Sequence, residues 1–178
     1  MNNELVVSNL KEGDIIFTSV SNVLYQSVEK ATNSHTSHVG IILKKDNQWV
    51  VAESRVPFSC YTPIDDFIGR SKNRWFSIKR LNEELSHDDV KSLHSFCSSE
   101  MGKLYHLGFK YKSNRQFCSK FVYDAFKSGL NVDVGKLVTF KQLLTENPST
   151  PTSFWRIWFF GLIPWKRITV TPASQYED

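Results

Sequence analysis

The sequence has few cysteines, and they follow no metal-binding or disulfide pattern. Its 178 residues include three, Cys60, Cys97 and Cys118, which lie far apart and form no CxxC pair. Zinc sites and disulfide frameworks need closely spaced or paired cysteines, so this spacing excludes both classes. We predict no metal and no cofactor, and such cysteine usage is typical of a reducing compartment.

Long hydrophobic runs are also missing. The longest, FWRIWFFGLIPW at residues 154–165, contains Arg156 and is shorter than the roughly 20 residues of a membrane-spanning helix. Residues 1–14, MNNELVVSNLKEGD, carry early acidic groups and no apolar stretch, so no signal peptide is visible. We therefore predict a cytoplasmic protein, with export that needs no N-terminal signal as the alternative.

Neither sign of charge dominates the sequence. The 22 basic and 18 acidic residues give a formal net charge of +4 and are scattered along the chain. This pattern is typical of a solvated surface, and we predict no nucleic-acid partner. The chain has no internal repeat, and its length suits one domain. We assign this domain to residues 1–147, with an aromatic extension at residues 148–178 packed on it.

The apolar spacing indicates a mixed α and β chain. Residues 86–102 begin with Ser86 three positions before Asp89, the pattern of a helix capping box, and place Cys97 on the apolar helix face. Cys60 lies in a proline-bounded stretch that we interpret as a loop. The other expected elements are strands at 10–19 and 73–81, helices at 21–32 and 139–148, and a hairpin at 37–54.

The stretch RQFCSKFVYDAF places Cys118 at the start of an amphipathic helix. Apolar residues recur at helical spacing after it, and Gly129 is a stop signal. A helix N-terminus stabilises a thiolate, so Cys118 is a candidate nucleophile. The alternative is that Cys118 packs as a small hydrophobic residue.

A cysteine nucleophile needs a base, and His38 is the best-placed of the five histidines. It lies on the first hairpin strand, and pairing Gly40 with Val51 would set His38 directly opposite Glu53. A shift of two residues would leave this pair diagonal but on the same face. A carboxylate beside an imidazole fixes its tautomer, and Gly40 would leave room for the helix start. The alternatives are a structural histidine and an exposed carboxylate.

Five short motifs in this order resemble a known family: GDIIF, SHVGI, AES, GKLYHLGF and FCSKFVYDAF. They are similar to the circularly permuted branch of the papain-like NlpC cysteine peptidase/amidase superfamily, and more narrowly to YiiX/YebB-like proteins. The resemblance covers about residues 10–144, and its order of His, acid and Cys is distinctive. It implies an α+β, circularly permuted papain-like fold, with a small antiparallel sheet or open barrel packed against helices and no metal.

The resemblance also implies roles for individual residues. Cys118 corresponds to the nucleophile, His38 to the base and Glu53 to the residue that orients it. The sequence departs from the family pattern at His106, where Asp is common, and at the residue before the nucleophile, where Tyr is common. The substrate-binding or oxyanion candidates are Tyr105, Phe117 and Ser37.

The implied activity of residues 1–147 is cysteine-dependent hydrolysis of an amide bond through an acyl-enzyme. The substrates would be small peptides, including cell-wall-derived ones, or N-acyl amino acids. One alternative is a lipid-directed thiol acyltransferase or esterase, and another is a non-catalytic binding module on a peptidase scaffold. For the aromatic stretch Phe154–Trp165 we expect packing on the core, with membrane-surface contact as the less favoured alternative.

Overall fold

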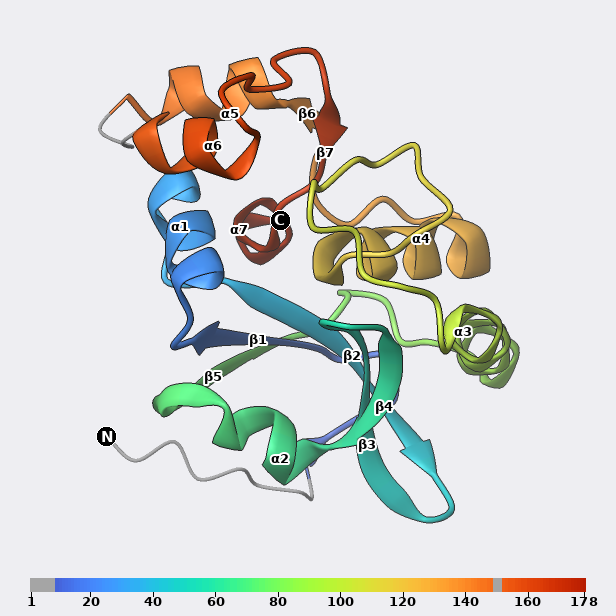
Figure 1. Ribbon diagram of the computed structural model, residues 1–178. Helices are drawn as coiled ribbons and strands as arrows, with labels where there is room; N and C mark the ends of the chain where they lie inside the picture. Colours follow the sequence, from blue (N-terminus) through green and yellow to red (C-terminus); the bar gives the residue numbers. More distant parts are fainter. Residues whose placement is uncertain (1–8, 149–151) are drawn as a thin grey trace.

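The computed structural model describes residues 9–148 and 152–178, which form a five-stranded antiparallel sheet covered by helices (Figure 1). The predicted absence of a signal peptide falls partly on residues 1–8, outside the described ranges. The sheet order is β4-β3-β2-β1-β5. Its strands are β1 (Ile15–Val20), β2 (His38–Lys45), β3 (Gln48–Ser54), β4 (Ser59–Pro63) and β5 (Ser71–Lys79). The α+β fold class is confirmed.

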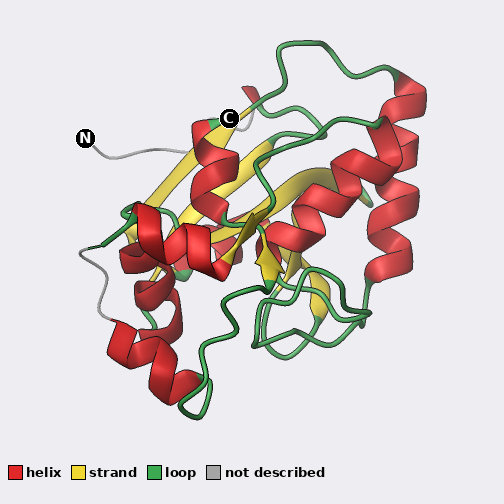
Figure 2. Ribbon diagram, turned by 90° about the horizontal axis from the view of Figure 1, so that it is seen from above, coloured by secondary structure: helices red, strands yellow, loops and turns green. Residues whose placement is uncertain are grey.

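Seven helices and two short strands complete the described ranges. Viewed from above, several helices lie across the sheet (Figure 2). The helices are α1 (Val23–Thr32), α2 (Ile64–Gly69), α3 (His87–Glu100), α4 (Cys118–Leu130), α5 (Phe140–Glu146), α6 (Thr152–Trp158) and α7 (Pro172–Glu177). The short strands β6 (Val138–Thr139) and β7 (Ile168–Thr169) pair with each other.

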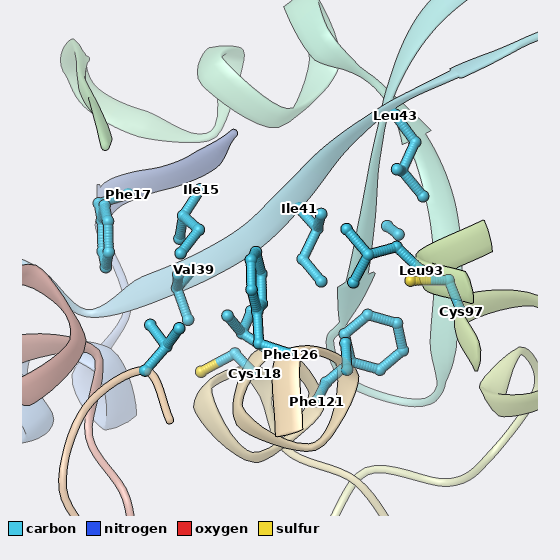
Figure 3. Packing of buried hydrophobic residues seen from close by; sticks show 14 of the residues in the cluster. Ile15, Phe17, Val39, Ile41, Leu43, Leu93, Cys97, Cys118, Phe121 and Phe126 are labelled. Atoms are coloured by element: carbon cyan, nitrogen blue, oxygen red, sulfur yellow. The ribbon is translucent and has the colours of Figure 1, made fainter. Parts of the chain in front are cut away.

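Both faces of the sheet are buried. Consecutive strand residues point to opposite faces, and each face packs against its own apolar cluster. On one face Val39 and Ile41 pack against α4, around Cys118 and Phe126 (Figure 3). On the other face Ile42 packs among the apolar residues of α2, together with Ile16, Val51, Phe67 and Ile68. The central strands are therefore almost entirely apolar, and polar residues enter only at their ends.

The hairpin register differs by two residues from the direct pairing we predicted. Ile42, not Gly40, pairs with Val51. The cause is the turn: Asp46 and Asn47 both adopt positive φ, 48° and 61°, and form a two-residue connection. Asp and Asn tolerate this conformation, and such turns fit the twist of hairpins.

Helix α4, which begins at Cys118, does not pack on the face of the sheet that we expected. We expected the start of α4 to approach the face that Gly40 leaves open. Instead α4 packs on the opposite face, and the space at Gly40 is filled by the Val51 side chain. A Cβ on Gly40 would lie 2.3 Å from Val51 Cγ1 and 3.0 Å from the Ala52 oxygen.

The predicted helices agree with the structure, but the strand β4 and the two-residue strands β6 and β7 were not predicted. The capping box of Ser86 and Asp89 is present at the start of α3, and Cys97 is fully buried, as expected. Cys60 does not lie in a loop: it belongs to β4 and pairs with Glu53. The polar residues and flanking prolines of β4 hide its strand character, because Pro is uncommon in strands except at edges.

The C-terminal segment joins the rest of the fold through aromatic contacts. The Trp155 ring lies edge-on to Phe140, with ring centroids 5.8 Å apart. The Ser119 hydroxyl donates to the Val170 oxygen at 2.8 Å, which ties the start of α4 to the segment before α7. This segment therefore helps to position the helix that carries Cys118.

We predict that Gly40→Ala destabilises the protein by about 1–3 kcal/mol, since the added methyl group must displace a tightly packed strand. Urea unfolding would measure the free-energy change. The control is Gly69→Ala, where the nearest atom to a new Cβ is the end of the Arg74 side chain at 3.7 Å. Equal stability of the two variants would show that the close approach at Gly40 carries no energetic weight.

Candidate active site

His38 and Glu53 form a buried pair at one end of the sheet. The His38 Nε2 atom lies 2.5 Å from Glu53 Oε2, and both side chains are almost completely excluded from solvent. His38 is the first residue of β2, and Glu53 lies near the end of β3. The observed register makes them diagonal neighbours on one face, which is close enough for their long side chains to meet.

Two further groups hold the Glu53 carboxylate. Its Oε1 atom accepts hydrogen bonds from Thr62 Oγ1 at 2.6 Å and from Arg70 Nη2 at 2.5 Å. Burial alone would raise the pKa of Glu53, but the His38 hydrogen bond and charge, followed by Arg70 and Thr62, lower the pKa to about 2. Glu53 is therefore a carboxylate at neutral pH, with a fixed orientation.

The second ring nitrogen of His38, Nδ1, is not used by Glu53. In the described ranges it is buried and has no hydrogen-bond partner, and Cys118 lies near enough to the ring to raise its pKa. Burial would lower the pKa of His38, but Cys118 and Glu53 outweigh it and raise the pKa to about 9. The ring is held between Tyr25 and Phe67, each with its centroid 5.4 Å away.

Cys118 is the first residue of α4 and is only 4 % exposed. No side chain caps this helix, so no cap competes for the backbone N–H groups of its first turn. The Tyr105 hydroxyl lies 3.9 Å from the Cys118 sulfur. Burial, and then the charge of Cys118, raise the pKa of Tyr105 well above its usual range, so this hydroxyl stays protonated and able to donate.

A narrow cavity begins at the thiol. It is partly open to solvent and comprises about 430 Å³ of empty space, part of which is open solvent. Cys118, Tyr105 and Tyr25 lie at its reactive end. The remaining wall is largely apolar and comes from α1, the connection between α3 and α4, α5 and the C-terminal segment, including Val28, Ala31, Phe109, Phe140, Leu143, Trp155, Val170 and Pro172. We call this cavity the apolar slot.

The other predicted residues are distributed unevenly around the slot. Ser37 lines it, but its hydroxyl accepts the Val20 N–H at 2.9 Å. Phe117 is fully buried and packs edge-on to Phe109 at 5.7 Å, away from the slot lining. His106 accepts the Gly108 N–H through Nδ1 and so stabilises its own turn.

Sequence reasoning missed three residues of the site, namely Tyr25, Thr62 and Arg70. Tyr25 was expected only as part of a helix, and Thr62 lies on the unpredicted strand β4. Arg70 directly follows α2, whose apolar residues Ile64, Phe67 and Ile68 recur at helical spacing. That short pattern was the available signal for a helix placing Arg70 near the sheet.

The geometry agrees with a family assignment made by comparison with known proteins. A family model described as "Permuted papain-like amidase enzyme, YaeF/YiiX, C92 family" matches residues 9–178. The chain belongs to this permuted papain-like amidase family. The match runs through the C-terminal segment, which the motif resemblance had left outside. Membership in an amidase family makes the chain a cysteine peptidase/amidase rather than a binding module.

Two YiiX proteins of Escherichia coli are similar to this member of the permuted papain-like amidase family. YiiX of strain K12 is 24 % identical over 165 residues, covering 93 % of this chain and 81 % of that protein. A crystal structure of metalloprotein yiiX from strain O157:H7 has a TM-score of 0.87 at 24 % identity, covering 94 % of this chain and 92 % of the other. The latter shows that the permuted papain-like fold is shared.

The name of that structure raises the question of a metal in this amidase. Within residues 9–148 and 152–178, no group of three or more His, Cys, Asp or Glu side chains is arranged to hold a metal ion. The residues described here therefore do not fit a metal centre.

In the same ranges, no helix combines the length and apolar character needed to cross a membrane.

The buried pair predicts how stability depends on pH. Protonated His38 stabilises the fold fully below its unfolded pKa of about 6.5, and this contribution is lost as pH rises through about 9. Ionised Glu53 stabilises the fold above about pH 4.5, and this contribution is lost as pH falls towards 2. The unfolding free energy should therefore fall between about pH 6.5 and 9, by on the order of 2–3 kcal/mol.

Urea unfolding at several pH values in this range would measure the decline. Glu53→Gln should flatten it, since the charge that favours protonated His38 is gone. The half-exposed His94, whose Nε2 lies 2.6 Å from Glu12, provides the control variant His94→Gln, which should keep the slope. A pH-independent stability in the unmodified protein would show that His38 is not held in its protonated form.

Proposed function

We propose that the protein hydrolyses an amide bond of N-acyl amino acids or small peptides through a thioester acyl-enzyme. The observation that carries this proposal is the buried Cys118, which lies beside the His38–Glu53 pair at the end of the apolar slot. A nucleophile, a base and a group that orients the base are the minimum set for thiol catalysis. Family membership supports the amidase chemistry.

In the first half-reaction the Cys118 sulfur attacks the carbonyl carbon of the amide. A carbon–sulfur bond forms, and the carbonyl electron pair moves onto oxygen. We assign stabilisation of this oxyanion to the Cys118 backbone N–H and to the Tyr105 hydroxyl, which lies 3.9 Å from the Cys118 sulfur and stays protonated. When the intermediate collapses, the carbon–nitrogen bond breaks, and protonated His38 gives its proton to the departing amine.

In the second half-reaction water replaces the amine. Neutral His38 removes a proton from the water as its oxygen attacks the thioester. The carbon–sulfur bond breaks, the acid is released, and Cys118 returns as a thiolate beside protonated His38. Glu53 keeps the ring oriented in both steps and stabilises its charged form, because Arg70 and Thr62 fix the carboxylate.

The slot supports an apolar acyl group on the substrate. Its wall beyond the thiol is mostly aliphatic and aromatic, which favours an apolar group there. This favours N-acyl amino acids over polar peptides. The same observation favours the second candidate, a lipid-directed thiol acyltransferase or esterase. Release of free amino acid from an N-acyl substrate would indicate the amidase, whereas acyl transfer to an added alcohol would indicate the second activity.

The proposed roles of His38 and Glu53 can be tested by a double-mutant cycle on N-dodecanoyl glycine, with released glycine as the readout. His38→Ala should lower kcat/KM by about 10²–10⁴, since it removes the general acid and base. Glu53→Gln should cost less, and the double variant should be about as inactive as His38→Ala alone.

Thermal unfolding of each variant would separate loss of fold from loss of rate, and Cys118→Ala provides the inactive reference. Losses that multiply in the double variant would mean that Glu53 does not act through His38. Full activity of Cys118→Ala would remove the basis of the proposed mechanism.

If the acyl chain binds in the slot, kcat/KM should depend on the length of that chain. Val28 lines the slot from α1, so Val28→Phe should fill part of it. We expect kcat/KM for an N-dodecanoyl substrate to fall about tenfold more than that for the N-acetyl analogue. Steady-state kinetics on both substrates would check this, with N-acetyl glycine as the internal control. Equal losses on the two substrates would show that the acyl chain binds elsewhere.

A further inference from the structure

Four large apolar side chains project into solvent from α6 and the loop that follows it. Their exposed fractions are 80 % for Ile157, 97 % for Phe160, 83 % for Leu162 and 44 % for Trp165. We call these four residues the apolar tip. Figure 1 shows α6 and its following loop at the end of the molecule away from α2 and the sheet.

A hydrogen-bonded backbone turn directs part of the tip away from the core. Phe160 and Gly161 adopt positive φ values of 51° and 93°, which reverse the chain directly after α6. A left-handed conformation is uncommon for a bulky residue such as Phe. The reversal is held by hydrogen bonds from Gly161 N to the Arg156 oxygen at 2.6 Å and from Leu162 N to the Phe159 oxygen at 3.2 Å. Phe160 therefore points outward in a well-supported turn.

The exposure is not a sign of poor packing in this segment. Trp155, on the same helix, is only 3 % exposed and lies edge-on to Phe140 and Phe109. The Trp158 Nε1 atom donates to the Leu107 oxygen at 2.9 Å. Thus one side of α6 anchors the segment to the core, and the other carries Ile157, which is 80 % exposed and is followed in the loop by the exposed Phe160 and Leu162.

The stretch of sequence that contains the tip carries only positive charges. Between Glu146 and Glu177 the sequence contains no acidic residue, but it contains Arg156, Lys166 and Arg167. Arg156 and Lys166 are exposed, and neither takes part in an ion pair within the described ranges. Apolar and aromatic side chains flanked by unpaired cations are the composition of segments that bind anionic membrane surfaces.

We propose that the apolar tip docks on the surface of an anionic phospholipid bilayer. Ile157, Phe160 and Leu162 enter the boundary between headgroups and acyl chains, and Trp165 lies at headgroup level. Arg156 and Lys166 contact lipid phosphates. This binding is peripheral and does not depend on the proposed chemistry at Cys118.

A protein partner fits these observations less well. Stable protein interfaces bury about 800 Å² on each partner, which is more than four side chains on a projecting turn provide. A second copy of the chain would bring Arg156 and Lys166 close to the same cations of its partner, where they repel each other. A lipid surface needs neither a large area nor a matching shape.

Co-sedimentation of the full chain with phospholipid vesicles tests the proposal. The protein should bind vesicles of phosphatidylcholine mixed with phosphatidylglycerol more tightly than pure phosphatidylcholine, and high salt should weaken this binding. Phe160→Ser combined with Leu162→Ser should reduce binding about tenfold or more. Arg156→Glu combined with Lys166→Glu should do the same for the anionic vesicles.

Two controls keep the result specific. Val56 is 47 % exposed on the connection between β3 and β4, and Val56→Ser should bind as the unmodified protein does. Cys118→Ala should also bind normally, so that a failed amidase assay and a failed membrane assay remain distinguishable. Because the tip residues are exposed, their variants should keep the thermal midpoint of the unmodified protein.

Three results would overturn the proposal. The first is absence of vesicle binding by the unmodified, folded chain, and the second is an equal loss of binding in Val56→Ser. The third is a change from dimer to monomer in Phe160→Ser combined with Leu162→Ser, measured by light scattering, which would assign the tip to self-association. Quenching of tryptophan fluorescence by brominated lipids gives an independent readout, and it should weaken in the same variants.

Discussion

A carboxylate with no exposure to solvent is the constraint around which this site is built. Burying an ionised group is costly unless hydrogen bonds and an opposite charge replace its lost hydration. Glu53 receives them from β2, β4 and the residue after α2, through His38, Thr62 and Arg70. Three separate elements must therefore be in place before the carboxylate is stable. These contacts engage Nε2 of His38 and leave its buried Nδ1 without a hydrogen-bond partner in the described ranges, so the carboxylate that the fold must stabilise also orients the proposed base.

Local patterns in the sequence were sufficient to predict the helix of Cys118, the helix capped by Ser86 and the hairpin of His38 and Glu53. They were insufficient for the register, because a shift of two residues preserves the alternation of apolar and polar positions. The left-handed backbone of Asp46 and Asn47 decided between the two registers. Thr62 and Arg70 were missed for a different reason: their contacts with Glu53 arise from tertiary packing, which short motifs do not encode.

In the C-terminal segment, amino-acid composition alone does not predict which residues are buried. Phe154–Trp165 is rich in aromatic residues, and its composition does not divide buried residues from exposed ones. The structure divides them by helix face and by a single reversal: Trp155 packs against Phe140, whereas Phe160 faces solvent. The packed part of the segment lines the slot together with Cys118, and the family match extends through it.

Circular permutation has a consequence for the order in which this protein is made. Synthesis proceeds from the N-terminus, so His38 and Glu53 leave the ribosome first, Cys118 follows, and Trp155, Val170 and Pro172 come last. These last residues form part of the wall of the slot. A nascent chain therefore contains the proposed nucleophile and base before it contains this part of the slot wall. In the proposed mechanism the choice of substrate depends on residues made well after Cys118, and a chain cut before Trp155 would lack them.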